Sequence, residues 1–196
     1  LDNAGKTTIL KKLGEEDTSS APEGPTQGFN IKTLSLEGRA AKLCDLGGQR
    51  ALREYWQDYY ENTDCLMYVV DSSDTRRLEE AHATFVDVLN SVPNVPVLVF
   101  ANKQDLATAK EPSVVAEVLQ LIDCRNRKWQ IQGCSAKTGD GLEQGVQWIM
   151  QNCQTQAGTA TPMMPFCKSL PFLWARDGKK TYRNSMTSGQ DHQFQI

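Results

Sequence analysis

The chain has 196 residues, of which 39% are hydrophobic and 23% charged, a composition typical of one ordinary globular domain. Its longest apolar run is the seven residues 95–101, far below the roughly 20 that a membrane-spanning helix needs, so we expect no transmembrane segment. The net charge of −3 argues against binding to a nucleic-acid backbone, which requires a strongly basic patch.

Short apolar runs alternate along the chain with stretches whose apolar residues recur at helical spacing. The runs are typical of strands buried on both faces, and the alternation predicts an α/β fold with a mostly parallel sheet and flanking helices. We expect strands at 29–36, 40–46, 65–71, 95–101 and 129–134. We expect helices at 9–13, 76–89, 113–122 and 142–153.

Two stretches lack this pattern. Residues 15–28 are rich in Ser, Thr, Pro and Gly, which predicts a mobile loop. From residue 154 the helical and strand patterns are lost, so we expect a folded domain at 1–153 and a disordered tail at 154–196. A partner-binding segment centred on Phe172, Leu173 and Trp174 is the alternative for the tail.

The chain opens on a phosphate-binding loop that lacks only its first glycine. The pattern G-x-x-x-x-G-K-[ST] places Gly5, Lys6 and Thr7 at the start of the first helix. In such a loop the backbone N–H groups attract phosphate, the lysine reaches the terminal phosphates and the hydroxyl binds Mg²⁺. The residues expected to bind the nucleotide here are Asp2, Asn3, Ala4, Gly5, Lys6, Thr7 and Thr8. A chance Gly-Lys-Thr at a helix start is the alternative for this motif alone.

The second motif, Asp-Leu-Gly-Gly-Gln, ends the strand predicted at 40–46. Asp45 at the strand end can lie beside a Mg²⁺-bound water, and Gly48 can bring its amide to a terminal phosphate without a side chain in the way. Gln49 can orient an attacking water, as a glutamine does in GTPases. Taken alone, the motif could also be an ordinary tight turn.

The third motif, Asn-Lys-Gln-Asp at 102–105, directly follows an apolar run and is the most specific signal in the chain. Asp105 can accept hydrogen bonds from N1–H and the 2-amino group of guanine, and adenine offers neither donor. A buried carboxylate left unpaired costs on the order of 1–3 kcal/mol or more, so the discrimination is steep. Lys103 can lay its stem along the base, Gln104 completes the motif, and Asn102 can tie two loops together. The alternative is a solvated loop.

Two weaker motifs complete the set. Ser135 and Ala136 follow the strand predicted at 129–134 and can offer backbone N–H groups to the guanine O6. Thr26 lies in the polar loop and can add a second hydroxyl to Mg²⁺. Each is weak alone, but all five motifs in this order exclude coincidence.

Together the motifs resemble the Ras-like small GTPases, and specifically their ADP-ribosylation factor (Arf and Arf-like) branch. The segments that carry the resemblance are D-N-A-G-K-T-T, P-T-Q-G-F-N, D-L-G-G-Q-R, Y-V-V-D-S-S-D, F-A-N-K-Q-D-L and W-Q-I-Q-x-C-S-A. The resemblance covers residues 1 to about 153 and implies the P-loop NTPase fold. It also implies that Thr26 belongs to a first switch, and Gly48 and Gln49 to a second.

The activity that this resemblance implies is a switch that binds GTP or GDP with Mg²⁺ and hydrolyses GTP slowly. Gln49 is then the catalytic residue, and Thr7 and Thr26 are the metal ligands. The implied partners are an exchange factor, a GTPase-activating protein and effectors such as carriers of lipidated cargo. The implied role is intracellular or ciliary trafficking, in the cytoplasm and peripherally at the Golgi, the cytoskeleton or a cilium.

The chain departs from the family pattern at its start. The family's amphipathic membrane-anchoring helix, its first strand and the first loop glycine have no counterpart in the sequence. In Ras-like sheets that strand is central, so we expect the chain as given to be at best partly folded and to bind GTP far more weakly than a completed protein. A well-folded chain would indicate that another segment fills the gap. The alternative function is a truncated or mis-annotated fragment with no stable nucleotide binding.

Overall fold

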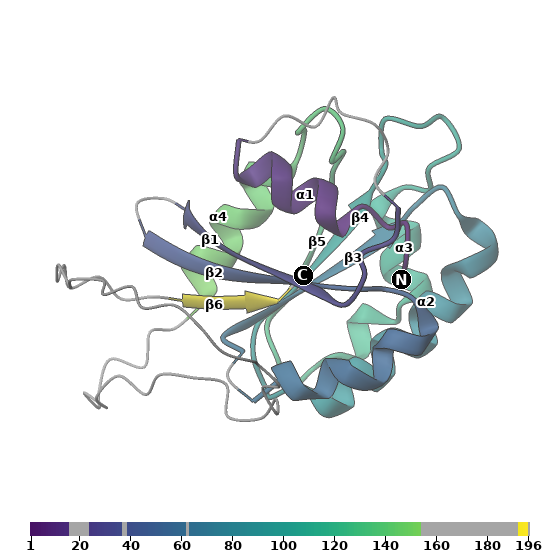
Figure 1. The fold of residues 1–196 in the computed structure, drawn as a ribbon. Coiled ribbons are helices and arrows are strands. Elements are labelled where there is room, and N and C mark those ends of the chain that lie inside the picture. The colour runs from purple at the N-terminus through teal and green to yellow at the C-terminus, as the bar shows by residue number, and fades with distance from the viewer. Residues whose placement is uncertain (16–23, 37–38, 62, 154–191, 196) are drawn as a thin grey trace, which may run out of the picture.

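A six-stranded sheet runs through the centre of the computed structural model, which describes residues 1–15, 24–36, 39–61, 63–153 and 192–195 (Figure 1). The strands are β1 (Phe29–Leu36), β2 (Arg39–Leu46), β3 (Cys65–Asp71), β4 (Val97–Asn102), β5 (Trp129–Gly133) and β6 (His192–Gln195). They lie in the order β1-β2-β6-β3-β4-β5. β1 and β2 pair antiparallel, and every other described pair is parallel. The predicted α/β fold with a mostly parallel sheet is confirmed.

Helices cover both faces of this sheet (Figure 1). They are α1 (Lys6–Leu13), α2 (Leu78–Ser91), α3 (Pro112–Val118) and α4 (Leu142–Asn152), with 3-10 helices η1 (Arg50–Tyr59), η2 (Thr75–Arg77) and η3 (Leu121–Asp123). α1 and α4 pack in one apolar core, and α2 and α3 pack in the other. Within the described ranges, no helix has the length and hydropathy required to span a membrane.

Side-chain alternation along β3 explains the two cores. Met67 and Val69 belong to the core formed with α1 and α4, whereas Tyr68 and Val70 belong to the core formed with α2 and α3. Because both faces are covered, every residue from 65 to 70 is buried. This double burial is the reason that the sequence shows a continuous apolar run instead of an alternating one.

The predicted boundaries differ from the described ones for local reasons. β4 begins at Val97, because Pro96 has no N–H for the ladder; its carbonyl accepts a hydrogen bond of 3.0 Å from the Leu66 N–H. The helix predicted at 113–122 is divided by Gln120, which has a left-handed φ of 53°, and it becomes α3 and η3. The sequence analysis did not predict η1.

The structure corrects the prediction of a disordered tail at 154–196. His192–Gln195 form β6, which pairs in parallel with Ala41–Cys44 of β2 and with Cys65–Leu66 of β3. The prediction is therefore wrong for these four residues. The physical reason is that two neighbouring strands with open edges offer an extended segment hydrogen-bond partners on both sides. β6 lies in the place that the sequence analysis expected to be empty.

Several other expectations fall on residues that the structure does not describe. These are the rest of the predicted tail, including Phe172, Leu173 and Trp174, and residues 16–23 of the predicted mobile loop. The tip of the hairpin between β1 and β2, residues 37–38, is also outside the described ranges.

Candidate nucleotide-binding site

The predicted site residues come from loops that share one edge of the sheet. Residues 1–5 lead into α1, and the other motifs follow the ends of β2, β4 and β5. Because these strands are parallel, their carboxyl ends meet at the same edge, which is where open α/β sheets bind ligands. The start of α1 lies at this edge as well (Figure 1).

The loop before α1 has a tightly turned backbone. Asn3 and Gly5 have left-handed φ values of 58° and 96°. A Cβ at Gly5 would also collide with the side-chain amide of Asn102, so glycine is required here on two grounds. The Lys6 ammonium folds back over the loop and donates a hydrogen bond of 2.7 Å to the carbonyl of Leu1.

Lys6 carries its charge in an enclosed place. Burial lowers the pKa of Lys6 from its usual 10.5, while Asp45 and Asp2 act in the opposite direction. A bound anion would offset the desolvation of this ammonium, because opposite charge favours the protonated form. Lys6 is therefore suited to pair with an anion at the start of α1, where the helix dipole also favours negative charge.

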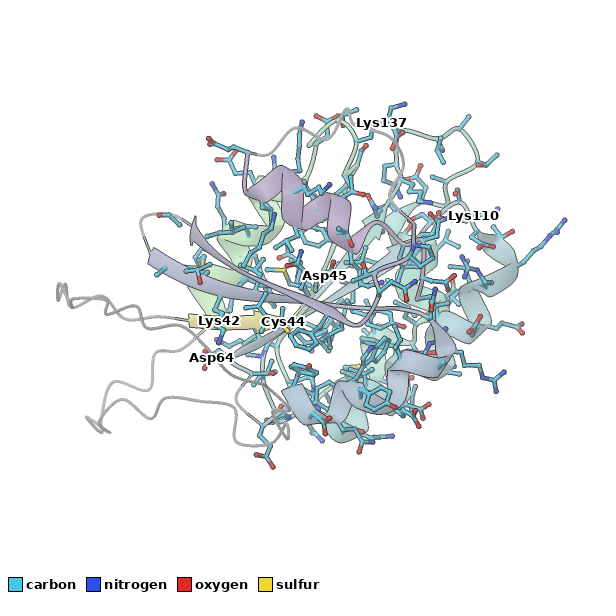
Figure 2. The ribbon with its side chains drawn as sticks, viewed as in Figure 1. Lys42, Cys44, Asp45, Asp64, Lys110 and Lys137 are labelled. Carbon is cyan, nitrogen blue, oxygen red and sulfur yellow. The ribbon has the colours of Figure 1, made fainter. Side chains whose placement is uncertain are left out.

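Three oxygen-bearing side chains from separate elements meet beside the first turn of α1. The Thr7 hydroxyl donates a hydrogen bond of 2.6 Å to the carboxylate of Asp45, which is fully buried at the end of β2. The hydroxyls of Thr7 and Thr26 share a hydrogen bond of 2.8 Å. Asp45 lies beside α1 near the centre of Figure 2. The structure thus brings together the two threonines that the sequence analysis selected as metal ligands and the aspartate beside them.

The segment after β2 packs directly on the phosphate loop. A Cβ at Gly48 would collide with the backbone of Leu1 and Asp2, so glycine is needed for this close approach. Trp56 and Arg53 of η1 hold the two glycines from the other side. The Trp56 indole donates to the Gly47 carbonyl at 3.0 Å, and the Arg53 guanidinium donates to the Gly48 carbonyl at 3.2 Å.

Gln49 lies immediately before η1 and is half-buried. Its backbone carbonyl accepts a hydrogen bond of 2.9 Å from the Leu52 N–H and so begins the helix. Gln49 thus lies next to Gly48 and close to the loop before α1.

Asn102 joins the loops around the site, as the sequence analysis expected. Its side-chain amide donates to the Ala4 carbonyl at 2.7 Å, and its side-chain oxygen accepts from the Ala136 N–H at 2.9 Å. Asn102, Ala4 and Ala136 are all buried. One side chain at the end of β4 therefore connects the phosphate loop to the loop after β5.

Asp105 lies in the loop after β4 and is exposed, whereas the sequence analysis argued from a buried carboxylate. Its carboxylate accepts a hydrogen bond of 2.7 Å from the hydroxyl of the buried Ser135, which fixes the direction of the carboxylate. Gln104 lies beside it, with its amide donating to the Lys110 carbonyl at 3.0 Å. The exposed Lys137 lies at the outer end of the loop after β5 (Figure 2).

Two charged residues that the sequence analysis did not select also hold the site. Asp71 at the end of β3 forms an ion pair of 2.7 Å with Lys103. Hydrogen bonds from Lys103 and Ser73 outweigh burial and lower the pKa of Asp71. Arg77 donates to the Asp2 carboxylate at 2.9 Å and to Asp74 at 2.6 Å. Asp71 had a sequence signal, since it ends a buried strand, whereas Arg77 had none.

Comparison with known proteins identifies the family. The ADP-ribosylation factor family matches residues 1–153. The chain belongs to this family. It is 51% identical over 153 residues to ADP-ribosylation factor-like protein 3 of Chlamydomonas reinhardtii, an alignment that covers 77% of this chain and 85% of the relative. It is 45% identical over 155 residues to the protein of the same name from Caenorhabditis elegans, covering 78% of this chain and 83% of that relative.

A solved structure agrees with this family assignment. The chain superposes with a TM-score of 0.70 and 31% identity on the Arl6 BBS3 small GTPase from Trypanosoma brucei, which was determined with the bound nucleotide analogue GppNp. The match covers 78% of this chain and 92% of that chain. The resemblance to Arf-like small GTPases is therefore confirmed, and members of this family are guanine-nucleotide-binding switches.

Proposed function

We propose that this chain binds GTP and GDP together with Mg²⁺ at the carboxyl edge of the sheet and hydrolyses GTP slowly. The observation that carries the proposal is the double hydrogen bond of Asn102. It couples the lysine-bearing phosphate loop to the loop after β5, whose Ser135 orients Asp105, so that phosphate and base groups of one nucleotide can be bound at once.

The phosphates would be bound by the loop before α1. The backbone N–H groups of residues 2–8 and the helix dipole favour negative charge, and Lys6 adds a full positive charge. The residues that take part are Asp2, Asn3, Ala4, Gly5, Lys6, Thr7 and Thr8. The Gly48 amide would contact a terminal phosphate, which is supported by the close approach of Gly48 to the backbone of Leu1 and Asp2.

The cluster of Thr7, Thr26 and Asp45 fits Mg²⁺, which prefers hard oxygen ligands. Thr7 and Thr26 would be direct ligands, and Asp45 would hold a coordinated water. Bound Mg²⁺ supplies positive charge that neutralises the phosphates. The hydrogen bond between Thr26 and Thr7 holds the first switch against the first turn of α1.

Gln49 would orient the attacking water for hydrolysis. Arg53, which contacts the second switch, is paired with Glu80 at 2.8 Å. Arg77, which contacts the phosphate loop, is paired with Asp2 and Asp74. Neither arginine is therefore free to stabilise the charge of the transferred phosphoryl group. Hydrolysis would be slow until a GTPase-activating partner supplies or organises this stabilisation.

The base would be read by the loop after β4. Asp105, oriented by Ser135, accepts from the two guanine donors, and Lys103, held by Asp71, lies along the base. Gln104 keeps this loop in shape. The predicted contact of the Ser135 and Ala136 N–H groups with the guanine O6 is not supported, because the Ser135 N–H donates to the Asp140 carbonyl at 2.9 Å and the Ala136 N–H to the Asn102 side chain at 2.9 Å. Adenine presents no matching donors, which makes the site selective for guanine.

Exposed apolar side chains support effector binding to the two switches. Phe29 is 46% exposed, Ile31 42% and Tyr55 55%, and Phe29 packs against Tyr59 with 5.2 Å between ring centroids. Aromatic side chains are common binding anchors. Effectors such as carriers of lipidated cargo would bind this face in the GTP state, as part of trafficking in the cytoplasm and at the Golgi, the cytoskeleton or a cilium.

Competition binding tests the proposal. With a fluorescent guanine nucleotide bound in Mg²⁺ buffer, GTP and GDP should compete at least roughly 100-fold better than ATP, which leaves Asp105 unpaired. Asp105→Asn should weaken guanine nucleotides and favour xanthine nucleotides, whose 2-oxo group accepts from the new amide. Asp123→Asn, an exposed change in η3, is the matched control and should leave the preference unchanged. Equal competition by ATP and GTP in the unmodified protein would contradict the proposal.

A further inference from the structure

A carboxylate lies in the loop that would bind phosphate. The backbone of Asp2 is packed so closely on Gly48 that a Cβ at Gly48 would collide with the Asp2 nitrogen. The Lys6 ammonium donates to the carbonyl of the preceding residue, Leu1, at 2.7 Å. Asp2 is therefore next to both groups that we assign to the terminal phosphate. A negative charge at such a position opposes the binding of an anion unless another residue compensates it.

Arg77 of η2 supplies this compensation. Its guanidinium donates to the Asp2 carboxylate at 2.9 Å and to the Asp2 carbonyl at 3.4 Å. The Nε of Arg77 donates to the Asp74 carboxylate at 2.6 Å. One planar guanidinium thus binds both the side chain and the backbone of Asp2, while Asp74 fixes its orientation from the other side. The three residues line the same small cavity beside the phosphate loop.

The Asp2 carboxylate is directed toward η2 by this contact. Among the ion pairs of the described residues, the pair with Arg77 is the one that Asp2 forms. Asp2 also interacts electrostatically with Lys6. A carboxylate released from Arg77 would be an uncompensated charge close to Lys6, where it would compete with a phosphate for the ammonium.

We propose that Arg77 is a positioning residue that neutralises the Asp2 carboxylate, holds it toward η2, and thereby sets the preference of the site for a triphosphate over a diphosphate. This inference rests on the proposed binding of GTP and GDP. Loss of Arg77 should weaken GTP more than GDP, because GDP lacks the third phosphate, which the groups beside Asp2 would bind. The side chains of Arg77 and Asp2 are 33% and 37% exposed, so water screens their charges, and the effect should be moderate and depend on salt.

Four variants of the full chain separate charge from structure. Arg77→Gln removes the compensating charge, Arg77→Lys keeps a charge, and Arg77→Gln combined with Asp2→Asn removes both charges of the pair. The matched control is Arg76→Gln, because Arg76 is an exposed neighbour in η2 and its loss changes the net charge equally.

Competition against a fluorescent GDP in Mg²⁺ buffer measures the affinities for GDP and for a non-hydrolysable GTP analogue. At low ionic strength, Arg77→Gln should weaken the analogue about fivefold and GDP by at most about twofold. In about 0.5 M KCl the two losses should become similar, because the charges are then screened. Arg77→Lys and Arg76→Gln should keep the ratio of the two affinities within about twofold of that of the unmodified protein.

The double variant is the decisive one. Asp2→Asn should restore the ratio in the Arg77→Gln background to within about twofold, because the carboxylate that opposes the third phosphate is gone. Failure to restore it, or a loss that does not change with salt, would overturn the proposal and assign Arg77 a structural role. Unfolding of Arg77→Gln, seen by circular dichroism, would do the same.

The control and the unmodified protein distinguish the remaining outcomes. A change in the ratio as large in Arg76→Gln as in Arg77→Gln would show an effect of net charge and would overturn the specific role of Arg77. Normal binding of both nucleotides by the unmodified protein, with an unchanged ratio in Arg77→Gln, would reject this inference alone. Failure of the unmodified protein to bind guanine nucleotides would reject the proposed function and this inference with it.

Discussion

Replacement of Asn102 by alanine should be one of the most damaging single changes at the carboxyl edge. Asn102 is 1% exposed, and its partners Ala4 and Ala136 are 2% and 5% exposed. The substitution removes the hydrogen bond to the Ala4 carbonyl and the one from the Ala136 N–H. Both backbone groups are then left without their partner in a place that water reaches poorly.

The expected cost follows from these two groups. A buried polar group that loses its partner costs about 1–3 kcal/mol, so the variant should lose about 2–6 kcal/mol of unfolding free energy in the absence of nucleotide. The side-chain amide also fills the space beside Gly5, and its removal leaves a small void. Since a domain has a net stability of only about 5–15 kcal/mol, a loss of this size is a large fraction of the total.

Urea unfolding of the nucleotide-free protein, followed by tryptophan fluorescence with chelator present, measures this loss without a contribution from nucleotide or metal. Gln132→Ala is the matched control at the end of the neighbouring strand. Gln132 is half-buried and donates one side-chain hydrogen bond, to the adjacent Gly133 carbonyl at 2.9 Å. The control should cost below about 1 kcal/mol. If Asn102→Ala costs no more than this control, Asn102 does not hold the two loops together.

Two further predictions concern catalysis and pH. Gln49→Leu should leave GTP affinity nearly unchanged, because it removes no phosphate contact. It should suppress partner-stimulated hydrolysis in single-turnover assays, because it removes the group that orients the water. Unchanged stimulated turnover would show that Gln49 has no part in the mechanism. Burial raises the pKa of Cys134 from 9.0 to about 12. Because the unfolded thiol ionises first, Cys134 should lower unfolding free energy above pH 9 by about 1.4 kcal/mol per pH unit. Cys134→Ala should reduce the slope by about this amount in urea unfolding at pH 8 to 10.5, while the buried thiols of Cys44 and Cys65, whose pKa values burial also raises, keep contributing; an unchanged slope would show that the Cys134 thiol does not contribute.

Most of the fold could be predicted from the sequence because its signals are local. β3 was predicted with its observed limits, 65–71, since burial on both faces selects one uninterrupted apolar run. β1 was also predicted with its observed limits, 29–36. The site motifs could be placed at one edge for a related reason. Each follows the end of a predicted parallel strand, and parallel topology alone brings such ends together.

β6 and η1 could not be predicted in the same way, because both depend on partners that are distant in the sequence. His192–Gln195 are only four residues long and form a strand between edges that lie more than a hundred residues earlier. η1 is held by Trp56, whose indole reaches the Gly47 carbonyl, and by Arg53, which pairs with Glu80. Neither contact leaves a periodic pattern in the sequence.

Side chains from three elements hold the phosphate loop. Lys6 holds the Leu1 carbonyl from α1, Arg77 holds the Asp2 carboxylate from η2, and Asn102 holds the Ala4 carbonyl from β4. Each of these side chains fixes a different residue of the loop. Loss of Asn102 should therefore disturb both the phosphate loop and the loop after β5.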